Sequence, residues 1–225
     1  MINKGKISDI FFSVQGEGLY AGAAQIFVRL YGCNISCRFC DTKLTHYDKH
    51  SPRQAYSIIK SFNVPYHSIS FTGGEPLLQE GFLGALLGLI KHDGTKTYLE
   101  TNGILYKQLS MLLEFVDIIS MDIKLPTSTG LGSFWREHER FLELARKKEV
   151  FIKAVVSRFT SEEDMLKAFE LVKLFDDRIP FVLQPNFYDT DNKLVSKLRD
   201  FQKKGLSVLR DVRIMPQLHK MIGVK

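Results

Sequence analysis

YGCNISCRFCDT, residues 31–42, contains every cysteine of this 225-residue chain: Cys33, Cys37 and Cys40. The CxxxCxxC spacing lets one short loop direct three thiolates toward one face of a metal cluster. Iron–sulfur clusters are held by Cys thiolates, and a [4Fe–4S] cluster normally takes four of them. With only three thiolates, one iron stays open to a ligand from outside the protein. The loop therefore predicts a cluster that can bind and reduce a substrate.

Two other interpretations of the cysteines stay open at this point. Structural zinc takes four Cys or His ligands, and His46, six residues after Cys40, could complete a Cys3His set. A disulfide would need an oxidising compartment and would leave one thiol unpaired. The first residues, MINKGKISDIFF, lack the apolar segment of a signal peptide, which favours a reducing cytoplasm and so the cluster.

With its aromatic residue Phe39, the CxxxCxFC loop resembles the cluster motif of the radical S-adenosylmethionine (SAM) enzymes. In that family the open iron chelates the amino and carboxylate groups of SAM, and an electron from the cluster cleaves the sulfonium to a 5′-deoxyadenosyl radical. The resemblance implies a [4Fe–4S] cluster and SAM as cofactors. It places Phe39, Cys40 and Asp41 of the cluster loop, residues 33–42, beside SAM.

Composition is consistent with one enzyme domain over residues 1–225. Hydrophobic residues make up 44% of the chain, enough for a core, and no apolar run reaches the ~20 residues of a membrane helix. The net charge of +6 is spread along the chain. It would suit nucleic acid, an anionic substrate or an acidic electron donor, although a solvated surface accounts for most of the lysines.

Runs typical of strands alternate with segments of helical length. The strands are expected at 24–32, 68–73, 96–102, 116–124, 149–157, 180–186 and 207–215. The helices are expected at 51–62, 77–92, 106–114, 133–148, 161–175 and 190–204. Such alternation indicates parallel strands with right-handed crossovers, and no G-x-G-x-x-G follows the first strand to indicate a dinucleotide-binding domain. We expect an α/β fold, an incomplete (β/α) barrel of parallel strands.

Polar residues gather just after these strands, where a barrel forms its active site. Turn preferences explain the prolines and some glycines, but they do not explain the convergence of Glu75, Glu100, Asp122, Lys124 and Gln184. The pattern predicts an enzyme with its site at the carboxyl ends of the strands.

TGGEP, residues 72–76, matches a second motif of the radical SAM family. Gly73 and Gly74 would let the backbone approach SAM closely, and Glu75 would accept from its ammonium or orient the loop. The resemblance adds further contacts to the polar groups of SAM, each of which could instead stabilise a loop: Glu100, Asn102, Asp122, Lys124 and Gln184.

Two features point to the substrate. In FFSVQGEGLYAG, residues 11–22, the amide of Gln15 beside the carboxylate of Glu17 matches the donor and acceptor edge of a pterin or guanine ring. Arg29 is a lone cation in an apolar strand, and a substrate carboxylate is its natural bidentate partner. A salt bridge within the protein is the alternative for Arg29.

Taken together, F-x-S-x-QGEG, VRLYGCN, CxFCDT, TGGEP, ETNG, SMDIK and PQLHK resemble the 7-carboxy-7-deazaguanine synthase family. The resemblance implies conversion of 6-carboxy-5,6,7,8-tetrahydropterin to 7-carboxy-7-deazaguanine with loss of ammonia, in queuosine or archaeosine biosynthesis. It implies Mg²⁺ held by Thr42, a reductant such as flavodoxin or ferredoxin, a homodimer, and no direct contact with nucleic acid or membrane. Some relatives have a serine where this chain has Asp122. The residues expected at the pterin are Val14, Gln15, Gly16, Glu17, Arg29, Thr72 and the carboxylate of Lys225.

Two alternatives compete with this function. An activase that installs a glycyl radical on a partner protein would have no use for Gln15, Glu17 and Arg29. A non-catalytic Fe–S or zinc module would need only the cysteines, and it would leave TGGEP and the polar strand ends without a role.

Overall fold

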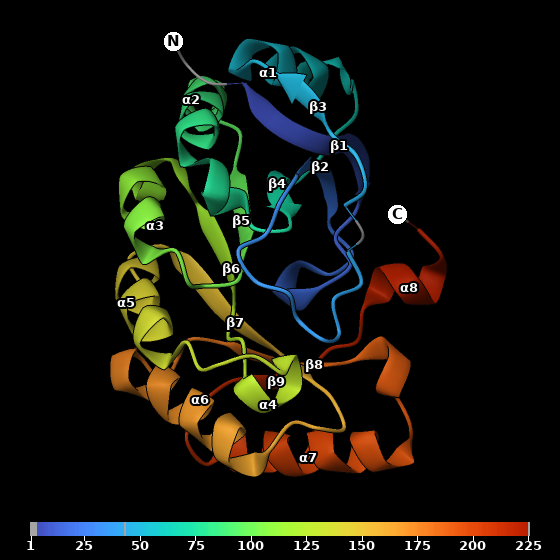
Figure 1. Cartoon of the computed structure of the whole chain (residues 1–225), viewed down its shortest axis with the longest axis vertical. Helices are drawn as coiled ribbons and strands as arrows, with labels where there is room; N and C mark the ends of the chain where they lie inside the picture. Colours follow the sequence, from blue (N-terminus) through green and yellow to red (C-terminus); the bar gives the residue numbers. More distant parts are fainter. Residues whose placement is uncertain (1–3, 43, 225) are drawn as a thin grey trace.

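Seven parallel strands lie side by side in the order in which they occur in the chain, in a computed structural model that describes residues 4–42 and 44–224 (Figure 1). They are β2 (Ala24–Leu30), β4 (Ser68–Gly73), β5 (Thr97–Thr101), β6 (Ile118–Asp122), β7 (Glu149–Val156), β8 (Phe181–Pro185) and β9 (Val212–Ile214). The sheet ends at β9 on one side, and within the described residues no strand closes it. This confirms the incomplete barrel.

The other edge of the sheet was not expected from the sequence. β1 (Gly5–Val14) pairs antiparallel with β2, and β3 (Asp48–His50) pairs antiparallel with β1. Residues 11–14, expected as part of a substrate-binding segment, are thus the last residues of a strand. The strand 207–215 was also partly wrong, because residues 207–211 form a turn and irregular chain and only Val212–Ile214 pair with β8.

Helices cover the outer face of the curved sheet (Figure 1). The six longer ones follow the expected segments: α1 (Pro52–Ser61), α2 (Glu80–Lys91), α3 (Tyr106–Leu112), α5 (Trp135–Ala145), α6 (Glu162–Phe175) and α7 (Asn192–Leu206). Ser161 caps α6 by accepting from the N–H of Asp164, as Ser preceding an acidic first turn predicts. Among the described residues, no helix is long and apolar enough to cross a membrane.

The chain after β1 fills one end of the barrel interior. The 3₁₀ turn η1 (Gly18–Tyr20) lies against β7 and β8, and Tyr20 packs edge-on against Tyr98 with the ring centroids 5.7 Å apart. A Cβ at Gly18 would overlap the Phe151 ring, and its φ is +65°, so this position requires glycine. The turn forms a floor beneath the site and leaves the carboxyl ends of the strands open.

Two short helices lie at the open end. α4 (Pro126–Thr129) follows β6, and α8 (Leu218–Ile222) follows β9. The backbone N–H of Leu218 donates to the carbonyl of Gly16 over 2.8 Å, which joins α8 to the segment after β1. The C-terminal part of the chain is thereby brought to the N-terminal substrate segment.

Candidate active site

Two adjoining cavities occupy the carboxyl ends of the parallel strands. The larger has a volume of about 450 Å³ and the smaller about 110 Å³. Glu17, Asp41, Thr42, Thr72, Gly73 and Glu100 line both. Nearly all of the residues expected to bind the cofactors or the substrate line one cavity or the other. The exceptions are Glu75, and Lys225, which lies outside the described residues.

The cysteine loop forms one wall of the larger cavity. Cys33, Cys37 and Cys40 all line it, and all three are free thiols, so the disulfide interpretation is wrong. The N–H of Arg38 donates to the carbonyl of Thr129 over 2.9 Å, and its guanidinium stacks on the Phe159 ring, 4.6 Å from the centroid. These contacts fix the loop against the chain that follows β6 and β7.

The donor set fits an iron–sulfur cluster. Thiolates are the ligands that such clusters take, and burial raises the pKa of Cys33 and Cys37 above its usual value, so ligation must displace their protons. The loop brings all three cysteines to the same cavity, where a cluster can take each thiolate on a different iron.

The glycines of TGGEP form a cradle in the same cavity. At Gly73, with φ +130°, a Cβ would overlap the carbonyl of Leu30, and at Gly74 it would overlap the carbonyl of Gly32. Both glycines line the cavity beside the cysteine loop. Glycine at both positions therefore lets this loop pack directly against the backbone at Leu30 and Gly32, which places its own backbone in the cavity wall where the approach to SAM is expected.

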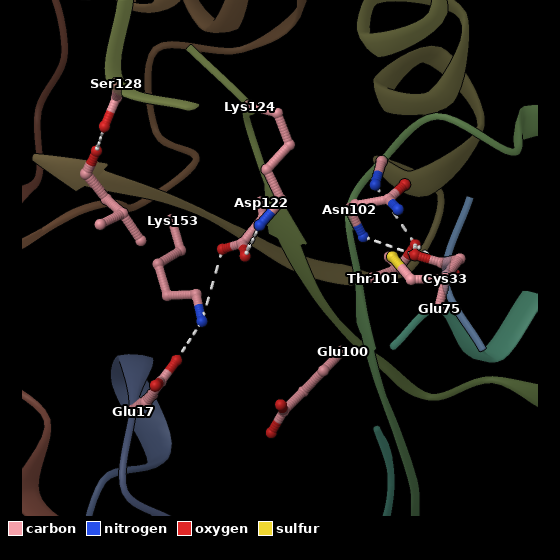
Figure 2. A network of polar contacts seen from close by, with 12 residues as sticks. Glu17, Cys33, Glu75, Glu100, Thr101, Asn102, Asp122, Lys124, Ser128 and Lys153 are labelled. Atoms are coloured by element: carbon pink, nitrogen blue, oxygen red, sulfur yellow. Dashed lines mark hydrogen bonds and ion pairs between the residues drawn. The ribbon is translucent and has the colours of Figure 1, made fainter. Parts of the chain in front are cut away.

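Glu75 lies beneath this cradle and is fully buried. Its carboxylate accepts from the N–H of Leu77 over 3.0 Å. It also accepts from the N–H of Asn102 over 2.8 Å and from the hydroxyl of Thr101 (Figure 2). Burial raises its pKa to about 7, against the lowering effect of these hydrogen bonds. Of the two roles expected for Glu75, this geometry fits orientation of the loop.

A chain of alternating charges crosses the larger cavity (Figure 2). The ammonium of Lys153 contacts the carboxylate of Glu17 and lies 3.4 Å from Asp122 Oδ1, while Lys124 Nζ lies 2.6 Å from Asp122 Oδ2. Burial would lower the pKa of both lysines, but the neighbouring carboxylates raise it above the usual value. Both lysines are therefore fixed cations, poorly suited to exchange protons at neutral pH.

The carboxylate of Glu100 lines both cavities and is hydrogen-bonded to the segment that forms the floor. It accepts from Gln15 Nε2 over 2.7 Å and from the Thr72 hydroxyl over 2.8 Å. Gln15 Nε2 also donates to Gln25 Oε1 over 2.9 Å, and Gln15 Oε1 accepts from the N–H of Glu17 over 3.0 Å. All polar atoms of the Gln15 side chain are thus engaged by the protein itself. This favours a supporting role for Gln15 over the direct substrate contact expected from the sequence.

The smaller cavity combines a cation with the oxygens expected at the substrate. Arg29 lines it with its guanidinium over the Phe11 ring, 4.9 Å from the centroid. In the described part of the chain no ion pair uses Arg29, so its expected salt-bridge alternative is not observed there. Thr42 lines both cavities. Val14 and Gly16 complete the expected set on the floor side.

A buried amide at the end of β8 faces the larger cavity. Gln184 lines it, and its Oε1 is buried with no hydrogen-bond partner among the described residues. An unpartnered buried acceptor is costly. A ligand that donates a hydrogen bond in this cavity would remove that cost, in agreement with the SAM contact expected for Gln184.

Several residues of the site were not predicted from the sequence. Gln217 Nε2 donates to Glu17 Oε1 over 2.6 Å, and Lys220 forms an ion pair with Asp41. His219 lines the smaller cavity, where it packs on Gly16. The PQLHK motif contains all three, but its contacts depend on α8 meeting a segment some 200 residues earlier. Lys153 had the signal that identified Arg29, a lone cation in an apolar strand.

His138 of α5 holds two of the strand ends from behind. It is fully buried; its Nδ1–H donates to the carbonyl of Gly103 over 3.0 Å, and its Nε2 accepts from the N–H of Lys124 over 3.0 Å. Burial lowers its pKa to about 4. The neutral ring therefore connects the loop after β5 to the loop after β6.

Comparison with known proteins gives the class of this site. Residues 27–173 match the family model for the Radical SAM superfamily, in agreement with the cysteine loop and the glycine cradle. The 7-carboxy-7-deazaguanine synthase of Geobacter sulfurreducens is 32% identical, over 97% of this chain and 97% of that protein. The 7-carboxy-7-deazaguanine synthase of Archaeoglobus fulgidus is 31% identical, over 99% and 100%.

The fold is shared with a solved structure. The crystal structure of QueE from Escherichia coli superimposes with a TM-score of 0.66 and 23% sequence identity, over 96% of this chain and 95% of that one. The chain belongs to the 7-carboxy-7-deazaguanine synthase family of radical SAM enzymes. With this assignment, neither the activase nor the non-catalytic binding module is needed to account for the cysteine loop.

Proposed function

We propose that this enzyme converts 6-carboxy-5,6,7,8-tetrahydropterin to 7-carboxy-7-deazaguanine with loss of ammonia, a step toward queuosine- or archaeosine-type 7-deazapurines. The observation that carries the proposal is the junction of the two cavities. One contains three thiols and a glycine cradle, and the other contains an arginine, a carboxylate and a hydroxyl suited to a carboxylated pterin. The names of the full-length relatives support the same product.

In this proposal the larger cavity holds the cofactors. Cys33, Cys37 and Cys40 would hold the [4Fe–4S] cluster, and the backbone at Gly73 and Gly74 would lie against the methionine part of SAM. When bound, the cluster and SAM together supply the 5′-deoxyadenosyl radical that abstracts hydrogen from the substrate. Further polar groups of SAM would meet residues that line the same cavity: Phe39, Asp41, Glu100, Asn102, Asp122, Lys124 and Gln184.

The smaller cavity would hold the pterin. Arg29 can bind the substrate carboxylate with two parallel hydrogen bonds, and Glu17, at the junction, can accept from the N–H groups of the ring. The Thr42 hydroxyl would hold Mg²⁺, which usually takes few protein ligands and keeps several waters. Bound there, the ion would supply positive charge for the substrate carboxylate, and Thr42 and Arg29 would together orient the substrate for reaction.

Three parts of the proposal lie outside the site. A one-electron donor such as flavodoxin or ferredoxin would reduce the cluster, and the exposure of Cys33 and Cys40 leaves the loop accessible to one. We further infer a homodimer that works in the cytoplasm and acts on the free pterin, without direct contact to nucleic acid.

Anaerobic turnover tests the proposed function. The reconstituted enzyme is given SAM, a reductant, Mg²⁺ and 6-carboxytetrahydropterin, and 7-carboxy-7-deazaguanine is detected by mass. We expect product from the parent enzyme and none from Cys37→Ala, whose iron content should also fall. A parent enzyme that retains a full cluster and cleaves SAM, yet yields no product from this pterin, would refute the assigned substrate.

A further inference from the structure

Lys153 is a deeply buried cation of the site and has no role in the function proposed above. In β7 the side chains alternate: Val150, Ile152, Ala154 and Val156 belong to the core under the helices, whereas Lys153 lines the cavity. Lys153 is only 6% exposed. Such an ammonium has to be neutralised by partners of its own.

The sheet and the floor each supply one of these partners. Asp122 of β6 lies directly opposite Lys153 in the parallel ladder, so its carboxylate is 3.4 Å away. Asp122 already has a second cation in Lys124. Glu17 comes from the turn that forms the floor, 136 residues earlier in the chain, and Lys153 is the cation it contacts among the described ion pairs. Glu17 therefore depends on Lys153 more than Asp122 does.

We propose that Lys153 is a positioning residue for the pterin and acts through Glu17: its ammonium holds the Glu17 carboxylate, as an anion and in one orientation, at the junction of the two cavities. The proposal rests on the proposed function, because it takes the pterin as the occupant. A carboxylate offers about four acceptor positions. Lys153 uses one on Oε2 and Gln217 one on Oε1, which leaves the others for N–H donors of the ring.

The electrostatics agree with this role. Burial by itself would raise the pKa of Glu17, but the charge and hydrogen bond of Lys153, helped by Gln217 and His219, lower it to about 2. Asp122 and Glu100 also raise the pKa of Lys153, so its positive charge does not depend on Glu17 alone. Without Lys153, burial would dominate, and Glu17 would take up a proton at a higher pH than it does now.

The test measures binding of pterin-6-carboxylate, an intrinsically fluorescent analogue, to reconstituted parent enzyme and variants from pH 6 to 8.5. For Lys153→Met we expect the ratio of its Kd to the Kd of the parent to rise as the pH falls. The rise should be at least about tenfold across this range, because a proton taken up by Glu17 blocks the oxygen that accepts from the ring. The ratio removes pH-dependent contributions that both proteins share. Lys153→Arg, which keeps the charge, should give a ratio with little pH dependence.

A second arm shows whether the effect passes through Glu17. The side chain in Glu17→Gln cannot ionise, so adding Lys153→Met to this variant should change Kd by less than about threefold at any pH. In a double-mutant cycle this result means strong coupling between positions 17 and 153. In this double variant position 17 carries a neutral amide, so the loss of Lys153 leaves no unpaired carboxylate on the floor that would hinder folding. Lys153→Gln replaces Lys153→Met if the latter does not fold.

Lys197 provides the matched control. Its ammonium donates to the carbonyls of Arg158 and Thr160, and it lines neither cavity of the site. Lys197→Met should alter thermal stability and leave the Kd ratio near one. A pH-independent ratio for Lys153→Met, or an equal loss of affinity in the Glu17→Gln background, would overturn the proposal. Failure of the proposed function would instead appear as a parent enzyme that binds no pterin-6-carboxylate and makes no product.

Discussion

The side-chain amide of Asn102 donates to the side-chain oxygen of Asn34 over 2.7 Å, and this hydrogen bond joins the cysteine loop to the end of β5. Asn34 directly follows Cys33, and the backbone N–H of Asn102 donates to the buried Glu75. These two hydrogen bonds hold the end of β5 together with the cysteine loop and the glycine cradle.

The first prediction concerns this hydrogen bond. Asn102→Ala removes the donor, and a hydrogen bond of this kind contributes roughly 0.5–1.5 kcal/mol, so the reconstituted cluster should be lost to a chelator about two- to tenfold faster. The visible absorbance of the cluster over time is the measurement. Asn63→Ala, at an exposed asparagine of another loop, is the control. Equal rates of loss in both variants would mean that the contact does not hold the loop.

Gly16 and His219 provide a second prediction. A Cβ at Gly16 would overlap the imidazole of His219, so Gly16→Ala should push α8 away from the floor and reshape the smaller cavity. We expect KM for the carboxypterin to rise at least about tenfold, with SAM affinity changed by less than twofold. Gly132→Ala is the matched control, because nothing lies within 4 Å of a Cβ there. Unchanged KM in Gly16→Ala would remove α8 from the substrate site.

Much of this architecture could be predicted from the sequence because burial leaves a local pattern. Apolar runs such as SISFTG and VFIKAVV are buried in the sheet, and their alternation with helices determined the parallel order. β1 was missed, because GKISDIFFSV pairs antiparallel at an edge and half of it is only partly buried. The run SVLRDVRIM looked like one strand, but its first five residues form a turn and irregular chain, in which Arg210 donates to Asp177, and only Val212–Ile214 form the strand.

The site was predictable where a residue type has one main use. Three cysteines in one loop suit a metal cluster, and two glycines after a strand suit a close approach of backbone to ligand. The sequence left both a ligand contact and loop orientation open for Glu75 and placed Gln15 at the substrate by its chemistry, whereas in the structure both side chains are hydrogen-bonded within the protein. That distinction depends on partners such as Asn102 and Glu100, far away in sequence, and no local pattern encodes it.

A third prediction follows from His138 and concerns stability. The pKa of His138 is lowered to about 4 in the folded protein, against about 6.5 in an unfolded chain. Between these values the unfolded state binds a proton that the folded state does not, so stability is lost as the pH falls from about 6.5 to about 4. The loss from this group amounts to about 3 kcal/mol.

Urea unfolding of the cluster-free protein at several pH values measures this effect. His138→Gln has no proton to bind, so it should be less stable than the parent at pH 7 and lose less stability on acidification. The difference between the two free energies of unfolding, followed against pH, isolates His138 from other groups such as Glu75. Parallel curves for the two proteins would show that His138 does not remain neutral in the folded state.

The last prediction concerns Thr42 and Mg²⁺. Thr42 lines both cavities, and its carbonyl lies 3.8 Å from the Cys40 sulfur, so the residue is close to both the expected cluster and the expected substrate carboxylate. Mg²⁺ usually takes few protein ligands and keeps several waters, so an ion bound here would take most of its ligands from substrate and water. Thr42→Val keeps the shape and removes the oxygen, whereas Thr42→Ser keeps the oxygen. We expect the serine variant to retain stimulation of turnover by Mg²⁺ and the valine variant to lose it, with iron content equal in both. A Mg²⁺ titration under anaerobic turnover is the measurement, and an undiminished response of the valine enzyme would place the ion elsewhere.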